Sequence, residues 1–423
     1  MNTFVLNNIA TILGLISGII IARYLGPGDR GNLSLIIISI SFFSLLSDFI
    51  NGGNEIQVGG NNSLQFPILI QSFFSCILIT LALYFVLFFI SSNFENHFSD
   101  ILDSIIIFLF SAIFLFQAIN ESTKRILLAR QDFFFLNRIQ LISSLIYAII
   151  TVFIIGYLGK GLLHVLVIIL INNIFISSSY LYRLLGKLKI IESIEYNMSL
   201  LKNSIFIGSR SVFVSIPTIF LLSSDLWLIQ ILTNNVNVGI YQIAVSISAL
   251  ILVPSRILSN IIRAKAVSEN NGIERALVIS KLFFFLSLGL TIIFFFTGKV
   301  LIELFYGFEY VSSFWPAFIL CVSHVIYGTS NILGGIILAK NKYPPFIIFG
   351  LNISFLTNLI LNFYLIPHYG INGAAYSSLI AYFIMNCFYS YKFITFSKIS
   401  FKDFFTVKFE IFLNLKKQIM TKM

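Results

Sequence analysis

The fold of this chain is decided by the stretch IIIARYLGPGDRGNLSLIIISIS, which covers residues 19–41. Two apolar runs flank a short segment, residues 26–31, that holds three glycines and a proline beside an aspartate and an arginine. Glycine and proline favour tight reversals of the chain. Arg23 stands where the first apolar run ends. This order predicts two membrane helices joined by a sharp elbow.

The composition extends the same interpretation to the whole chain. Its 423 residues are 58% hydrophobic and only 10% charged, and the mean hydropathy is +0.95. A soluble domain is about half apolar and about a quarter charged, so most of this apolar surface must face lipid or other helices. The first run lacks a basic leading segment and a small-residue cleavage site, which favours a retained helix over a cleaved signal. We therefore predict a polytopic membrane protein.

Twelve apolar runs are long enough to cross a membrane, because a spanning helix needs about 20 apolar residues. Strands of a membrane barrel are shorter and alternate strictly between apolar and polar residues, which these runs do not. The predicted class is therefore an all-α integral membrane protein. The runs cover residues 4–24, 32–54, 66–90, 101–120, 133–155, 161–182, 203–226, 236–258, 280–298, 312–336, 346–366 and 372–393.

Lysine and arginine are divided unevenly between the two sets of predicted loops. One side carries 22 of the 27 basic residues, and the other carries only Arg23, Arg30, Lys160 and Lys299. Arg210 lies within a predicted span. Positively charged loops stay in the cytoplasm, so both termini are predicted to be cytoplasmic and the elbow to face outward. We therefore interpret the net charge of +10 as a sign of basic cytoplasmic loops at the inner membrane surface and not of nucleic-acid binding.

Three short stretches recur along the chain at offsets of 208 to 211 residues. GNLSLIIISIS at 31–41 resembles GIYQIAVSISA at 239–249, and LLARQD at 127–132 resembles ILAKNK at 337–342. YLGKG at 157–161 resembles YGING at 369–373, with Gly159 matched to Gly370 at an offset of 211. Each half holds six spans, so both halves enter the membrane in the same direction, related by a pseudo-twofold axis along the membrane normal. Such repeats are typical of transporters; a duplicated scaffold without transport is the alternative.

The repeat divides the chain into four parts. We predict an N-terminal six-helix lobe over 1–184, a basic cytoplasmic linker over 185–202, a C-terminal six-helix lobe over 203–393 and a basic cytoplasmic tail over 394–423.

Four stretches carry a family resemblance: IARYLGPGDRG at 21–31, SSDLWLIQILTNNVNVGIYQIAVSIS at 223–248, GGIILAKNK at 334–342 and LNFYLIPHYGINGAA at 361–375. The chain resembles the flippases of polysaccharide and O-antigen repeat units, which belong to the multidrug, oligosaccharidyl-lipid and polysaccharide exporter superfamily. The resemblance extends from the first span to about residue 393.

The resemblance implies a twelve-helix, two-lobed transporter in the inner membrane of a bacterium. Its implied cargo is an oligosaccharide on undecaprenyl diphosphate, moved from the inner to the outer leaflet for lipopolysaccharide or related polysaccharide biosynthesis. Coupling to H⁺ or Na⁺ and contact with a polysaccharide polymerase are further implications. A multidrug exporter of the same superfamily is the alternative, although its cationic drugs would favour a carboxylate in the first helix, where this chain has Arg23.

No enzyme constellation accompanies these features. The four histidines lack zinc-type spacing, and GPGDRG lacks the following Lys-Ser/Thr of a nucleotide-binding loop. A membrane glycan polymerase or ligase is expected to carry a larger outer loop than residues 91–105 supply. The sequence therefore predicts a non-enzymatic protein without a cofactor or a metal site.

Arg23 and Arg210 are the predicted substrate-binding residues. A diphosphate carries compact negative charge, and arginine matches its oxygens with paired donors. For Arg23 the alternative is a side chain that reaches the outer headgroups. For Arg210 the alternatives are a side chain that reaches the inner headgroups and pairing with a neighbouring helix.

Asp48, Arg256 and Asp225 are the candidates for gating or ion coupling. Charged groups at membrane depth are costly and normally face a cavity or a partner. At the repeat offset of 208, Asp48 aligns with Arg256, so these two residues are predicted to form an inner gate. Asp225 is a candidate for ion coupling. The alternative for both carboxylates is a structural ion pair within one lobe.

Several asparagines also fall in the predicted spans. Their amides can hydrogen-bond either to sugar hydroxyls in a cleft or to neighbouring helices. They are Asn172, Asn173, Asn352, Asn358 and Asn362.

Overall fold

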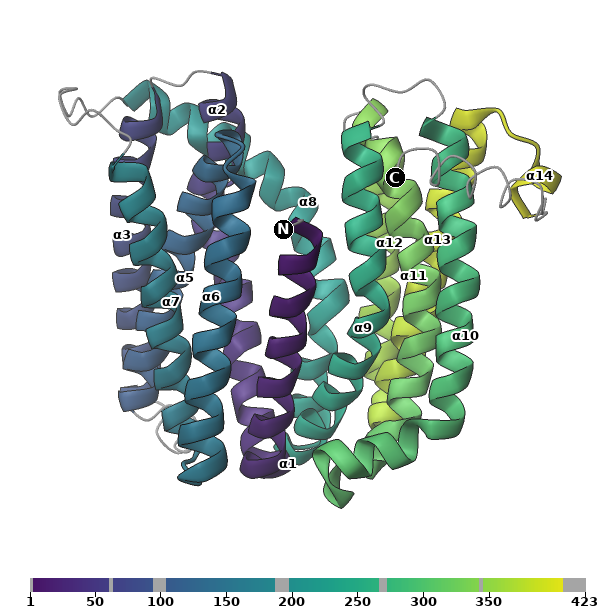
Figure 1. The fold of residues 1–423 in the computed structure, drawn as a ribbon, viewed down its shortest axis with the longest axis horizontal. Helices are drawn as coiled ribbons and strands as arrows, with labels where there is room; N and C mark the ends of the chain where they lie inside the picture. Colours follow the sequence, from purple (N-terminus) through teal and green to yellow (C-terminus); the bar gives the residue numbers. More distant parts are fainter. Residues whose placement is uncertain are drawn as a thin grey trace. The chain divides into compact units, whose positions relative to one another are not determined.

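The computed structural model describes residues 3–60, 64–93, 104–186, 198–265, 272–341 and 345–405, and every regular element within these ranges is a helix (Figure 1). Eleven segments of the described chain are long and apolar enough to cross a membrane. The first of them, Ile9–Gly59, is 51 residues long and has room for two crossings. The predicted all-α membrane class is confirmed, and the chain is a multi-pass membrane protein.

Helix α1 (Thr3–Asn51) contains the predicted elbow. At 1.5 Å per residue, its 49 residues extend for more than twice the ~30 Å thickness of a hydrocarbon core. The helical geometry breaks at Gly26, where φ is 73° and ψ is 172°, directly before Pro27. A positive φ is open to glycine, and proline fixes the φ with which the next helix starts. Figure 1 shows α1 turning back on itself. The reversal therefore needs one residue and no separate loop.

The chain forms two compact units, residues Met1–Ile219 and Phe220–Met423. The first unit contains α1, α2 (Asn54–Gly60), α3 (Gln65–Asn93), α5 (Ser104–Ala129), α6 (Phe133–Thr151), its π-helical extension η2 (Val152–Tyr157), α7 (Leu162–Leu185) and the first part of α8 (Met198–Leu232). The second contains the rest of α8, α9 (Asn235–Lys265), α10 (Gly272–Tyr306), the 3₁₀ helix η3 (Phe308–Ser313), α11 (Phe314–Asn341), α12 (Pro345–Tyr369), α13 (Ile371–Ser397) and α14 (Phe401–Phe405).

Each unit has its own apolar core. In the first unit α1, α5 and α7 contribute buried aliphatic side chains such as Ile36, Ile113 and Val165. In the second unit the core lies between α9, α11 and α13, and includes Ile336 and Tyr389. Large apolar side chains also remain exposed along most helices, as expected where helices face lipid.

The first part of α8 packs against the end of α1 and against α2. Gly208 lies so close to the Phe49 backbone that an added methyl group would overlap the carbonyl oxygen, and a methyl group on Gly53 would lie 2.7 Å from the Ile207 side chain. Gln57 Nε2 also donates a hydrogen bond to Ser204 Oγ at 3.1 Å. Residues 203–219, expected to open the C-terminal lobe, therefore pack with the first unit. The segments 187–197 and 406–423, which hold most of the predicted linker and tail, lie outside the described residues.

Two glycines matched in the sequence repeat share an unusual backbone conformation. Gly159 has φ of 61° and Gly370 has φ of 58°. Gly159 lies in the turn before α7, and Gly370 directly precedes α13. Each glycine thus lets the chain turn into the last membrane helix of its half.

Candidate functional site

Asp225 is the centre of a buried polar cluster in the second unit. It lies on α8, and three helices contribute hydrogen-bond donors to its carboxylate. Tyr241 Oη of α9 donates to Oδ2 at 2.8 Å, Ser378 Oγ of α13 donates to Oδ2 at 2.6 Å, and Asn362 Nδ2 of α12 donates to Oδ1 at 2.7 Å. Asp225 is only 5% exposed. The carboxylate is therefore held in place by side chains of three neighbouring helices.

A second layer of side chains surrounds these donors. Asn358 lies one helical turn before Asn362 on α12, so both amides face the cluster. Asn362 Nδ2 also donates to Asn358 Oδ1 at 3.1 Å, and Ser224 Oγ donates to the same oxygen at 3.4 Å. Asn358 and Asn362 have no exposed surface. Of the two roles considered for these asparagines, the structure displays hydrogen bonding between helices.

The charge of this cluster is not balanced by a basic side chain. Asp225 forms no salt bridge with any residue that the structure describes. An isolated buried carboxylate is costly, and at membrane depth such groups mark ion or proton sites. Asn362 Oδ1 is a further buried oxygen that accepts no hydrogen bond within the described ranges. The oxygens around Asp225 are the donor set that a proton or a small hard cation prefers.

Asp48 has a different environment, because it is paired. Arg125 Nη2 of α5 lies 2.8 Å from Asp48 Oδ1, and both side chains are about one-fifth exposed. This is an ion pair within the first unit, the alternative considered from the sequence. Arg256, its expected partner, is exposed on α9 and lies close enough to Tyr327 and Tyr382 to interact with them electrostatically. The gate between Asp48 and Arg256 stays a prediction.

The two arginines expected to bind diphosphate both lie in the first unit. Arg23 is exposed on α1, three residues before the elbow. Arg210 is exposed on α8, within the continuous helix Met198–Leu232. Its Cζ lies 4.2 Å from the centre of the Phe206 ring, a cation–π distance.

Arg30 is a charged residue whose burial the sequence did not indicate. It was expected in an outward turn, but α1 continues past the elbow and leaves Arg30 only 9% exposed. Tyr147 of α6 lies close enough to interact with it electrostatically. The signal that could have suggested this is the direct resumption of the apolar run after residue 31.

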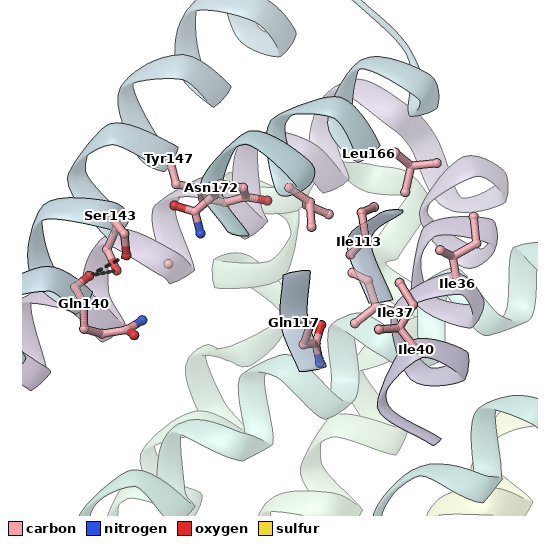
Figure 2. A pocket seen from close by; sticks show the side chains of 13 residues that line it. Ile36, Ile37, Ile40, Ile113, Gln117, Gln140, Ser143, Tyr147, Leu166 and Asn172 are labelled. Carbon is pink, nitrogen blue, oxygen red and sulfur yellow. Dashed lines mark hydrogen bonds between the residues drawn. The ribbon is translucent and has the colours of Figure 1, made fainter. Parts of the chain in front are cut away.

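A pocket of about 300 Å³ lies within the first unit, between α1, α5, α6 and α7 (Figure 2). Its lining is divided: in Figure 2 Gln140, Ser143, Tyr147 and Asn172 lie on one side, and isoleucines of α1 and α5 lie on the other. None of its lining side chains is an acid or a base. They are Gly14, Ile36, Ile37, Ile40, Ile113, Gln117, Gln140, Ser143, Ser144, Tyr147, Leu166, Ile169 and Asn172.

No group of three histidine, cysteine, aspartate or glutamate residues within the described ranges is arranged to hold a metal ion. The sites identified are thus the Asp225 cluster, the Asp48–Arg125 pair, the arginines and the pocket.

Comparison with solved structures identifies the architecture. The lipid II flippase MurJ, in an inward closed conformation, superposes with a TM-score of 0.77 at 19% identity, covering 95% of this chain and 88% of that chain. An inward-facing MATE multidrug resistance transporter of the MOP superfamily superposes with a TM-score of 0.71 at 14% identity, covering 95% and 100%. The chain has the MOP-superfamily fold.

More distant structures share this MOP fold. A eukaryotic MATE transporter, AtDTX14, superposes with a TM-score of 0.52 at 15% identity and covers 94% of this chain and 92% of that chain. No family model and no curated protein sequence matches the chain. The expected two-lobed, twelve-helix architecture is confirmed at the level of the fold.

Proposed function

We propose that this chain is a transporter that moves a lipid-linked oligosaccharide from the inner to the outer leaflet of a bacterial cytoplasmic membrane by alternating access. The observation that carries the proposal is the likeness to the lipid II flippase over 95% of the chain, with a TM-score of 0.77. The sequence resemblance to O-antigen unit flippases supports the same class of cargo. Both termini are cytoplasmic in this proposal, and a polysaccharide polymerase receives the cargo.

Arginines of the first unit bind the diphosphate of the cargo in this proposal. Arg23 and Arg210 are both exposed residues. Arg210 forms no salt bridge with a carboxylate in the described chain. Arginine binds phosphate oxygens through two parallel N–H groups. This supports an anionic cargo.

The Asp225 cluster is the proposed coupling site. A carboxylate buried among Tyr241, Asn362 and Ser378 is stabilised further when a proton or Na⁺ neutralises it. Binding of that cation favours one packing of α8 against α12 and α13 and biases the conformational equilibrium. Cation binding and release at Asp225 thereby drive the alternating-access cycle that carries the lipid-linked cargo across the membrane.

Multidrug export is the second candidate function. It is favoured by the MATE transporters that share the fold, one of them aligned over 100% of its length. A site for cationic drugs would be expected to contain an exposed acid. The pocket of the first unit has no acid in its lining, and Asp48 is bonded to Arg125. These features favour the flippase.

Reconstitution separates the two functions. The purified chain is placed in proteoliposomes that contain a fluorescent undecaprenyl-diphosphate glycan. The fraction of the fluorescence that an external quencher removes is followed with time. A flippase raises that fraction above the one half that static liposomes give. Ethidium uptake in the same liposomes, driven by a Na⁺ or pH gradient, tests the exporter. Ethidium transport without glycan movement would overturn the proposal.

A further inference from the structure

We infer that the pocket between α1, α5, α6 and α7 binds a neutral sugar ring. The assignment of that sugar to the glycan of the cargo rests on the proposed function, whereas the binding of a sugar does not.

The first observation concerns the amides of the pocket. Gln117, Gln140 and Asn172 line the pocket from three different helices (Figure 2). The bonds drawn at Gln140 go to its backbone oxygen, which accepts from Ser143 and Ser144. Asn172 Oδ1 is buried and accepts no hydrogen bond from the described residues. A buried polar atom without a partner costs about 1–3 kcal/mol. These amides are therefore available to a ligand.

The neighbouring amides on the same two helices behave differently. Asn120, three residues after Gln117 on α5, donates to Asn173 Oδ1 of α7 at 2.9 Å, and Ser177 Oγ donates to Asn120 Oδ1 at 2.6 Å. That pair joins α5 to α7. The chain thus places one set of amides where they hold the helices together. A second set lines the pocket, with Gln117 one turn before Asn120 and Asn172 next to Asn173.

The opposite wall of the pocket indicates that the ligand also has an apolar face. Ile36, Ile37, Ile40 and Ile113 form an aliphatic surface (Figure 2). A hydrocarbon chain would satisfy this wall but leave the amides unpaired, which is unfavourable. A sugar ring satisfies both walls, because its C–H groups form an apolar face and its hydroxyl groups form a polar rim.

Charge excludes other ligands. No acid or base lines the pocket, so a diphosphate or a cation finds no counter-charge there. Arg30 is a nearby base and interacts with Tyr147, but it is not part of the lining. The volume of about 300 Å³ is at the lower end of the ~300–1,000 Å³ of small-molecule pockets, which fits one or two sugar residues.

Cysteine protection tests sugar binding directly. Ser144 lines the pocket, and its replacement Ser144→Cys introduces a thiol there. Cys387 is exposed and is changed to Ser, whereas Cys76 and Cys321 are buried. Labelling of Ser144→Cys by a small methanethiosulfonate is measured in nanodiscs with a panel of neutral disaccharides, built from hexoses, N-acetylhexosamines and deoxyhexoses, and with pyrophosphate and a short polyprenol.

We expect at least one neutral disaccharide, at about ten times its Kd, to slow labelling about tenfold by mass action. Pyrophosphate and the polyprenol leave the rate unchanged. Gln117→Leu and Asn172→Leu abolish the protection. Gln242→Leu, which removes an amide that donates to Ser246 of its own helix in the other unit, retains it. If no disaccharide protects, or if pyrophosphate or the polyprenol protects equally, the inference is wrong.

A flipping assay then separates this inference from the proposed function. Wild-type protein and the Asn172→Leu variant are compared on undecaprenyl diphosphate with and without its glycan. Loss of glycan-dependent movement in the variant, with movement of the bare lipid retained, assigns the pocket to the cargo. If wild-type protein moves neither lipid, the proposed function fails, and the protection experiment still decides whether the pocket binds sugar.

Discussion

Arg125 binds both the side chain and the backbone at the end of the second crossing of α1. Its Nη2 donates to Asp48 Oδ1 at 2.8 Å, and its Nη1 donates to the Gly52 carbonyl oxygen at 2.9 Å. One guanidinium on α5 thus fixes the position at which α1 ends and the chain turns into α2. The same position receives α8, because Gly208 packs on the backbone of Phe49.

Loss of either partner of this ion pair should destabilise the protein. Asp48→Asn or Arg125→Gln is expected to lower the free energy of unfolding by about 1–3 kcal/mol. This range lies between the losses caused by breaking an exposed salt bridge and by breaking a buried one. Thermal unfolding in detergent measures the effect. The charge swap Asp48→Arg with Arg125→Asp should recover part of the loss. A second double variant combines Asp48→Arg with Arg256→Asp. If only this second variant restores transport, the functional contact is the predicted inner gate and not the pair within the first unit.

Gly208 should not tolerate a side chain. Gly208→Ala introduces a methyl group that overlaps the Phe49 carbonyl oxygen and lies 2.7 Å from that of Asp48, and overpacking of this kind costs about 1–3 kcal/mol. Thermal stability of the purified variant measures the cost. Gly18→Ala is the matched control, because nothing lies within 4 Å of the added methyl group and alanine favours the helix by up to about 1 kcal/mol. Equal stabilities of the two variants would contradict the observed packing.

Neutralisation of Asp225 should uncouple transport from the cation gradient. Asp225→Asn keeps the size of the side chain and removes the charge, so we expect gradient-driven transport to fall about tenfold or more while the protein remains folded. Binding of ²²Na⁺ and the dependence of transport on pH identify the cation. Tyr241→Phe removes one donor and keeps the carboxylate, and should retain the cation dependence. Undiminished gradient-driven transport by Asp225→Asn would exclude the coupling role.

The exposed arginines should act on the anionic end of the cargo. Arg23→Ala and Arg210→Ala are each expected to reduce surface glycan in a flippase-deficient strain without loss of membrane insertion. Lysine at either position should restore part of the activity, since it keeps the charge but not the paired donors. Surface glycan is measured on cells with matched protein levels. Full complementation by both alanine variants would favour side chains that only reach the headgroups.

The orientation of the chain follows from its basic loops and has its own test. A reporter active only in the cytoplasm should be active when fused after Lys202 and inactive when inserted in the elbow between Gly28 and Gly31. The opposite pattern would reverse every statement about inside and outside.

Helix positions were predictable from the sequence because the length of an apolar run is set by the membrane. The predicted spans 133–155 and 346–366 fall within Phe133–Tyr157 and Pro345–Tyr369. The elbow was predicted too, but as a turn of several residues, because composition does not reveal that Gly26 alone departs from helical φ and ψ.

The partners of the charged residues were not predictable in the same way. Asp225 was recognised as a candidate, but its donors Tyr241, Asn362 and Ser378 lie up to 153 residues away. These side chains come together only if each of the four helices is rotated about its axis so that the polar residue faces the others. Helix packing determines these rotations, and they cannot be read from apolar runs of nearly uniform composition. The pairing of Asp48 with Arg125 was missed for the same reason, because the repeat offset pointed to Arg256.

The dependence of the first unit on α8 has a consequence for biosynthesis. A nascent chain that ends at residue 186 holds α1 to α7, yet Gly53 and Gln57 still lack Ile207 and Ser204, which cover them in the finished protein. The N-terminal half therefore completes its packing only after the ribosome has passed residue 208 and these side chains have left the exit tunnel. A gene split for separate expression in the basic segment between α7 and α8 would therefore leave the N-terminal half without Ser204 and Ile207.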